Sequence, residues 1–205
     1  FGKSGSPFDD PGRAIDETTE RLLEFLDDED LEDDSGPSKF ALLRAAQDGE
    51  PASVQELLDK GADPNATAAG RYLTTLMVAT AFGQKDVADL LLKSGAHPAL
   101  GLSLGEKTCL MVAATCGEAE ITSSLVEAGA SIGTQSKDGQ PWGNGNRKFH
   151  RSAALTYAIY GGHVETVRTI LEKADEKSPD PPAKLLQSTD IAGHPLTSTN
   201  QALLH

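Results

Sequence analysis

A glycine recurs at a fixed interval along the chain and constrains its fold more than any other feature. Gly49, Gly83 and Gly117 are 34 residues apart, and a Gly-Ala pair follows each of them twelve residues later. Short apolar blocks flank each glycine, which is the pattern of two short antiparallel helices joined by a tight turn. Because such a helical hairpin cannot bury its own apolar face, copies at this period are expected to stack into a solenoid.

Three stretches carry a resemblance to a known family. They read TTLMVATAFGQKDVADLLLKSGA at 74–96, TCLMVAATCGEAEITSSLVEAGA at 108–130 and ALTYAIYGGHVETVRTILEKA at 154–174. They resemble ankyrin repeats, whose first helix typically reads T-P-L-H-x-A-A and whose second reads G-H-x-E-I-V-x-L-L-L-x-x-G-A. The resemblance implies an all-α solenoid of four full repeats and a partial fifth, joined by short hairpin loops.

The chain is expected to have two parts. Residues 1–38 form an acidic arm in which apolar residues recur at helical spacing, so we expect one amphipathic helix from about Pro11 to about Leu26. The ankyrin repeat domain follows at 39–205. Its expected repeats are about 39–70, 71–104, 105–150 with an insertion, 151–187 and a partial repeat at 188–205.

Most of the negative charge lies in the arm. The chain has a net charge of −13, and residues 1–38 carry −10 of it, with 13 acidic residues against three basic ones. Nucleic acids and anionic membrane surfaces need clustered Lys and Arg, so we expect neither as a partner. No apolar run approaches the roughly 18 to 20 residues that span a bilayer, so we expect no direct membrane insertion.

Two interpretations of the arm are open. In the first, its helix covers the open end of the first repeat while the acidic run keeps that end solvated, because terminal repeats need polar caps. In the second, the acidic run docks on a basic partner, or Leu22, Phe25 and Leu26 lie in a groove.

The third repeat is followed by an insertion at 136–151. It lengthens the distance from Gly117 to the equivalent Gly162 to 45 residues and contains the only tryptophan, Trp142, together with Arg147 and Phe149. A long insertion on a regular solenoid tends to lie on its functional side, and Trp and Arg are enriched in binding hot spots. The alternative is that Trp142 packs back onto the hairpins and the basic residues are solvated.

Shorter hairpin tips join the other repeats and are expected to project sideways from the stack. The tip at 66–73 carries Arg71 and Tyr72, and the next tip carries Leu102, which either folds under the neighbouring hairpin or belongs to a contact surface. The resemblance implies that partners bind these tips and exposed inner-helix positions, one of which we expect Tyr157 to occupy. The predicted partner-binding residues are Arg71, Tyr72, Leu102, Trp142, Arg147, Phe149 and Tyr157.

The sequence has no pattern that indicates chemistry, so we predict no catalytic residues, no cofactor and no metal site. It lacks a phosphate-binding glycine loop, a nucleophile motif and Cys or His pairs at metal spacing. We expect His163 to make a local hydrogen bond. Cys109 and Cys116 are seven residues apart in one predicted helix, about 10 Å, which is too far for a disulfide, so we expect reduced, packed thiols and a reducing compartment.

These patterns predict a protein-protein interaction module that acts as an adaptor or assembly scaffold. Two alternatives stay open: a regulatory ankyrin region of a longer enzyme or channel, and a permanent structural subunit of a large, or even organellar, complex. The chain begins at Phe1 and stops where a further repeat begins, so we expect a processed or truncated product. We expect an intracellular, cytoplasmic protein, or an organelle-imported mature chain, whose partners are proteins.

Overall fold

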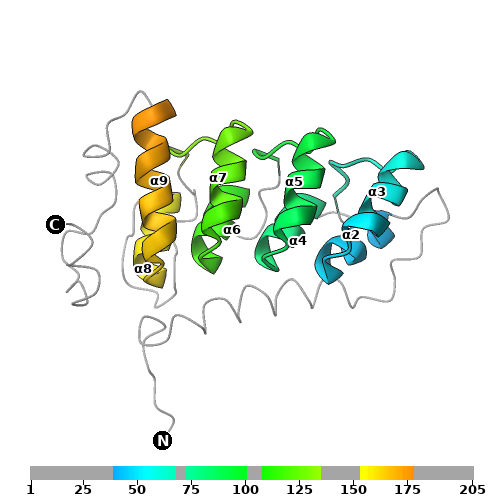
Figure 1. The fold of residues 1–205 in the computed structure, drawn as a ribbon, viewed down its shortest axis with the longest axis horizontal. Coiled ribbons are helices and arrows are strands. Elements are labelled where there is room, and N and C mark those ends of the chain that lie inside the picture. Colours follow the sequence, from blue (N-terminus) through cyan, green and yellow to red (C-terminus); the bar gives the residue numbers. More distant parts are fainter. Residues whose placement is uncertain (1–38, 68–72, 101–107, 135–152, 178–205) are drawn as a thin grey trace, which may run out of the picture.

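Four helical hairpins stacked side by side make up the part of the chain that the computed structural model describes, residues 39–67, 73–100, 108–134 and 153–177 (Figure 1). The expected all-α solenoid of stacked helical hairpins is therefore confirmed for the described residues. The repeat boundaries stay a prediction. The hairpins pair α2 (Lys39–Asp48) with α3 (Pro51–Asp59), α4 (Thr75–Ala81) with α5 (Lys85–Lys93), α6 (Cys109–Cys116) with α7 (Ala119–Glu127), and α8 (Ala154–Gly161) with α9 (Val164–Lys177).

The helices form two parallel rows. The inner row contains α2, α4, α6 and α8, each in contact with the next, and the outer row contains α3, α5, α7 and α9 in the same order (Figure 1). Each inner helix also contacts the outer helix of its own hairpin. A hairpin therefore packs on its immediate neighbours, as expected of a repeat protein.

The core repeats with the sequence. One leucine of each inner helix, at Leu42, Leu76, Leu110 and Leu155, is almost completely buried, and alanines beside it let the helices approach closely. Each outer helix adds its own buried apolar residues, such as Leu91 in α5 and Leu125 in α7. Burial of such side chains stabilises each hairpin only when a neighbour is present, at about 1.5 to 3 kcal/mol per large side chain.

Glycine and threonine set the ends of the inner helices. Gly117 ends α6 in the left-handed region at φ 81°, where a residue with a Cβ is strained. At the other end of the same helix, the side chain of Thr108 accepts a hydrogen bond from the Met111 N–H at 3.3 Å. Thr74 caps α4 in the same way, whereas α8 begins after Ala153, which has no side chain that could do so. The inner helices thus begin and end at fixed points of the repeat.

The turns that follow α3 and α5 are linked by hydrogen bonds. Asn65, after α3, donates from Nδ2 to the Gly95 carbonyl at 3.1 Å and accepts from the His97 N–H at 2.8 Å. His97 in turn accepts a hydrogen bond from the Ala99 N–H on its Nδ1 at 3.2 Å, as expected of a turn residue. The two Asn65 bonds hold the turn after α3 and the turn after α5 in register.

Candidate protein-binding surface

Six of the seven predicted partner-binding residues lie outside the described residues. They are Arg71, Tyr72, Leu102, Trp142, Arg147 and Phe149. These six residues belong to three segments that join successive hairpins. The described residues on either side of each segment lie at equivalent places, after the end of an outer helix and before the start of the next inner helix. The three segments, at 68–72, 101–107 and 135–152, therefore start and finish at the same edge of the solenoid.

Two described features mark the bases of these segments. Thr67 and Thr74 form an isolated antiparallel β-bridge, which is the expected geometry at the base of a hairpin tip. Leu100, at the start of the second segment, is 44% exposed, and it is the only large apolar side chain of the described residues that is exposed to this degree. This exposure fits a contact surface better than a leucine folded under its neighbour.

Tyr157 does not lie at an exposed position, so that expectation is wrong. Its side chain is only 2% exposed, and its equivalents Val78 and Val112 are buried as well. Arg44, the equivalent in α2, lines the groove on the end face of the first hairpin, where no described hairpin precedes it. Tyr157 accordingly belongs to the core of the stacked hairpins. Its side chain contributes to the packing between hairpins. Tyr157 is therefore not one of the surface residues available to a partner.

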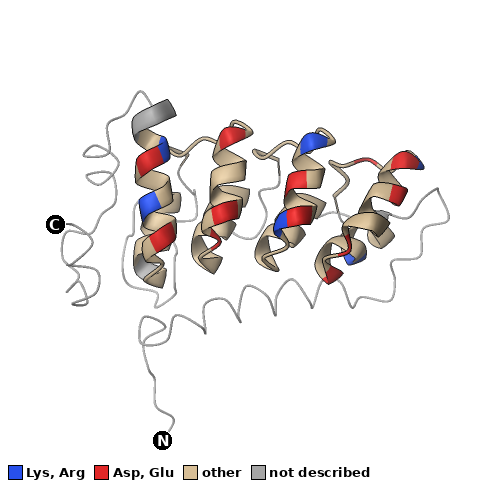
Figure 2. Cartoon of the chain, in the orientation of Figure 1, with Lys and Arg blue, Asp and Glu red and all other residues tan. Residues whose placement is uncertain are grey.

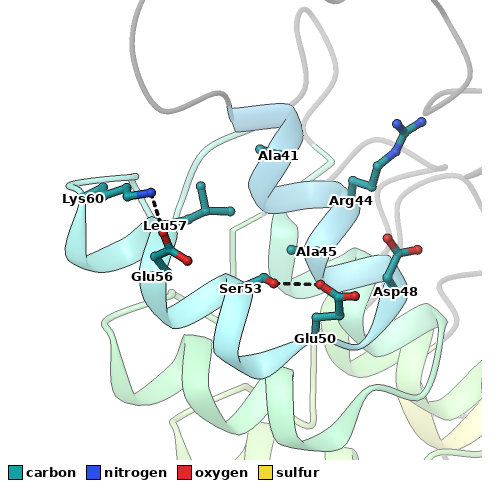
Figure 3. A pocket seen from close by; sticks show the side chains of 9 residues that line it. All are labelled: Ala41, Arg44, Ala45, Asp48, Glu50, Ser53, Glu56, Leu57 and Lys60. Carbon is teal, nitrogen blue, oxygen red and sulfur yellow. Dashed lines mark hydrogen bonds and ion pairs between the residues drawn. The ribbon is translucent and has the colours of Figure 1, made fainter.

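A groove of about 400 Å³ opens on the end face of the first hairpin, and it was not predicted from the sequence (Figure 3). This face has no preceding hairpin among the described residues, so side chains that are covered in later repeats are accessible here. The one sequence signal for it was Arg44, a charged residue where later repeats have Val78, Val112 and Tyr157. Its lining residues are Ala41, Arg44, Ala45, Asp48, Glu50, Ser53, Glu56, Leu57 and Lys60.

The groove carries charges of both signs that are partly paired with each other. Lys60 Nζ lies 2.6 Å from Glu56 Oε1, and this hydrogen-bonded ion pair lowers the pKa of Glu56. Ser53 donates to Glu50 Oε2 at 2.7 Å, while Arg44 and Asp48 point outward (Figure 3). Shallow walls and mixed, solvated charges suit a weak polar contact. They do not provide the buried nucleophile or acid-base pair that catalysis needs.

Neighbouring hairpins are also linked where each outer helix begins. Gln84 donates to the Gln47 carbonyl at 3.1 Å, and His163 Nε2 lies 2.9 Å from the Thr115 carbonyl oxygen. Both carbonyls belong to the last turn of an inner helix, where they have no partner within the helix. The expectation of a local bond for His163 is therefore wrong, because its partner belongs to the preceding hairpin.

The two cysteines pack as small apolar residues, as predicted. Cys109 is fully buried, and burial raises the pKa of its thiol to about 12, so it stays protonated and unreactive. Cys116, at the end of α6, is 9% exposed. Within the described ranges, no three His, Cys, Asp or Glu side chains gather in a way that could hold a metal ion. None of the helices described is long and apolar enough to cross a membrane.

The family follows from a comparison with known proteins. The family model for ankyrin repeats matches the chain in three copies, over residues 14–102 and 42–136, which together span more than half of its 205 residues. The chain belongs to the ankyrin repeat family. Ankyrin repeats generally mediate protein-protein interaction, and the family is typically non-catalytic. The match stops before α8 and α9, so the fourth hairpin is recognised from its sequence and its packing.

A comparison with curated proteins finds no match to this chain.

Proposed function

We propose that the chain is a protein-binding adaptor or scaffold whose partner contacts the edge that carries the hairpin tips and the insertion. The observation that supports this proposal is the common location of the described residues that flank these three segments, which lie at one edge of the two-row core. A rigid support favours binding because less conformational freedom is lost when the partner docks.

Residues of the type that dominates binding energy occur in these segments. They are Arg71 and Tyr72 in the first segment and Trp142 and Arg147 in the insertion. Leu102 in the second segment and Phe149 in the insertion add large apolar side chains. Tyr, Trp and Arg are the residues most enriched in binding hot spots. Leu100, which is exposed at the base of the second segment, adds apolar surface at the same edge.

The test compares two triple variants of the full chain as baits in quantitative capture from native lysate. Trp142→Ala, Arg147→Ala and Phe149→Ala remove the three large side chains of the insertion. The matched control removes Glu165, Arg168 and Glu172 from the outer surface of α9, where all three are exposed. A melting temperature within about 2 °C of the wild type confirms that each bait is folded.

We expect the insertion variant to lose its specific partner at least about tenfold, because truncating one hot-spot residue costs 2 kcal/mol or more. We expect the control to retain it. Equal capture by the wild type and the insertion variant would contradict a binding role for the insertion. Loss of the partner from the α9 control alone would move the binding surface to the outer row.

A further inference from the structure

The residue that follows the turn glycine occupies an equivalent place at each junction between described hairpins. Its side chain lies against the turn glycine of the preceding hairpin, so closely that a Cβ added to that glycine would collide with it. The three residues are Gln84 against Gly49, Glu118 against Gly83 and His163 against Gly117. The repeat thus brings an amide, a carboxyl group and an imidazole to the same kind of site.

At two of these junctions the side chain contacts a backbone carbonyl two residues before that glycine. Gln84 Nε2 donates to the Gln47 carbonyl at 3.1 Å, and His163 Nε2 lies 2.9 Å from the Thr115 carbonyl oxygen. Counted in the same way from Gly83, the carbonyl at the junction of Glu118 is that of Ala81, the last residue of α4.

The Ala81 carbonyl receives no hydrogen bond from the backbone that follows it. The Lys85 N–H, four residues later, donates to the Gly83 carbonyl at 2.9 Å, and the Gln84 N–H donates to the Ala79 carbonyl at 2.8 Å. Ala81 itself is only 6% exposed. A buried carbonyl without a donor is unfavourable, so this site favours a side chain that can donate a proton to it.

Only one of the two forms of Glu118 has a proton to donate. The charged carboxylate only accepts hydrogen bonds, and it lies beside the C-terminal end of α4, where the helix dipole is negative. The protonated carboxyl group can donate one hydrogen bond. Burial also disfavours the charged form, and it raises the pKa of Glu118 above the ordinary value of 4.5.

The charged groups around Glu118 come from the outer helices. Glu120, in the first turn of α7, adds to the rise in the pKa of Glu118, and His163, just before α9, opposes it. Lys85 and Asp86 lie in the first turn of α5, and Lys85 is itself held in an ion pair. The inner helices α4 and α6 carry no charged residue, in contrast to the outer row (Figure 2). Neither of these inner helices can therefore offer Glu118 a cation.

We propose that Glu118 makes a proton-dependent hydrogen bond to the Ala81 carbonyl, which ties the second hairpin to the third at acidic pH. In the neutral form the carboxyl O–H donates to this carbonyl, as Gln84 donates to the Gln47 carbonyl at the first junction. When the proton leaves, the hydrogen bond is lost, and the carboxylate and the carbonyl oxygen repel each other. The amide of Gln84 does not titrate, so its bond is the same at both pH values.

The hydrogen bond couples proton uptake to the contact between two hairpins. Both hairpins also pack through apolar residues such as Leu91 and Leu125, so loss of the proton weakens the junction without separating the hairpins. A partner that requires the hydrogen-bonded arrangement of these two hairpins therefore binds more tightly at acidic pH.

Nuclear magnetic resonance can follow both ends of the bond during a pH titration of the full wild-type chain. The carboxyl carbon of Glu118 reports its protonation, and the carbonyl carbon of Ala81 reports the hydrogen bond that it accepts. The Gln47 carbonyl is the internal control, because its donor is an amide. We expect the Glu118 and Ala81 signals to shift with one common midpoint above 4.5, while the Gln47 signal stays constant.

Glu118→Gln is the matched variant, because it keeps the size of the side chain and removes the group that titrates. We expect its Ala81 signal to be independent of pH and close to that of the acidic wild type.

An Ala81 signal that does not follow Glu118 in the wild type would overturn the proposal, and so would a Glu118 midpoint at or below 4.5. An Ala81 signal that still titrates in Glu118→Gln would also overturn it, because the change would then come from another group, such as His163 or Glu120. The wild-type titration decides the case alone if the variant does not fold.

Discussion

Two junctions between neighbouring hairpins use the same positions but differ in one side chain. At the first junction Gln84 donates a hydrogen bond to a carbonyl in the last turn of α2, two residues before Gly49. At the second junction the equivalent residue is Glu118, which lies against Gly83 just as Gln84 lies against Gly49. A charged carboxylate has no proton to donate, so it cannot cap the equivalent carbonyl of α4.

Equivalent residues of successive repeats thus lie at the same place in the fold. The interaction made at that place depends on which side chain occupies the position. At the third junction His163 fills the place and reaches the Thr115 carbonyl. Burial raises the pKa of Glu118, and the nearby charge of Glu120 adds to this, while His163 opposes it. The raised pKa of Glu118 makes its fit to this place depend on pH.

The largest effect is expected from the apolar packing that both junctions share. Leu91 in α5 and Leu125 in α7 are equivalent and completely buried, so Leu91→Ala and Leu125→Ala should each lower the free energy of unfolding by about 2 to 5 kcal/mol. Denaturant unfolding measures both, with Leu100→Ala, at an exposed site, as the control that should change it by less than about 0.5 kcal/mol. Losses that differ widely between the two leucines would show that the junctions are not packed alike.

Removing the side chain at the third junction should cost less. His163→Ala leaves the Thr115 carbonyl oxygen without its partner in a part-buried place, so we expect a loss of about 1 to 3 kcal/mol in unfolding free energy. His163→Gln should recover most of this loss, because Gln84 makes the same bond at the first junction. A glutamine variant as unstable as the alanine variant would mean that the histidine ring contributes through packing and not through its hydrogen bond.

Glu118→Gln should give the second junction the side-chain hydrogen bond that Gln84 makes at the first junction. The new amide can donate to the α4 carbonyl, so we expect a gain of about 0.5 to 1.5 kcal/mol at neutral pH. Thermal and denaturant unfolding at constant ionic strength measure this gain. The reciprocal variant Gln84→Glu is the matched control and should lose a comparable amount at the first junction. Equal stability of Glu118→Gln and wild type would show that no donor is needed there.

The pH dependence of this pair has a defined sign. Because the folded-state pKa of Glu118 is raised above its ordinary value of 4.5, the folded protein holds this proton more tightly than the unfolded chain. The stability that this contributes is complete below the ordinary pKa and is lost as pH rises through the raised pKa. The difference in stability between Glu118→Gln and wild type should therefore grow with pH over that window, and a flat difference would contradict it.

The smallest effect is expected at the surface of the third junction, where Lys173 of α9 lies 2.8 Å from Glu127 of α7. Glu127 is more than half exposed, so the pair should contribute less than about 1 kcal/mol and should weaken with salt. A double-mutant cycle with Lys173→Ala and Glu127→Ala isolates the pair from the other contacts of each residue. A coupling energy well above 1 kcal/mol would mean that this ion pair, absent from the equivalent described positions of the first junction, holds the last hairpin in place.

The repeat period was enough to predict the stacked helical hairpins, because a hairpin of this length has only one way to bury its apolar face. It was not enough to place Tyr157. The sequence showed Val78 and Val112 at the same position, and their apolar character indicates a buried site. Arg44 was the misleading member, since it lines the groove at the end face of the first hairpin, where no described hairpin precedes it.

The partner of His163 could not be found from sequence either. The Thr115 carbonyl is 48 residues away, across an insertion that no regular period spans. Contacts between hairpins depend on the position and orientation of each hairpin relative to its neighbour. The sequence pattern within one repeat does not show these.

Contacts between immediate neighbours alone also determine how the molecule would respond to a pulling force applied at its two ends. Among the described hairpins, the first and the last each have one neighbour to lose and the two interior ones have two, so detachment should begin at an end of this row. Each released repeat of 34 residues would add up to about 120 Å of extended chain. The solenoid would thus lengthen in discrete steps under tension, one repeat after another, while the remaining hairpins stay folded.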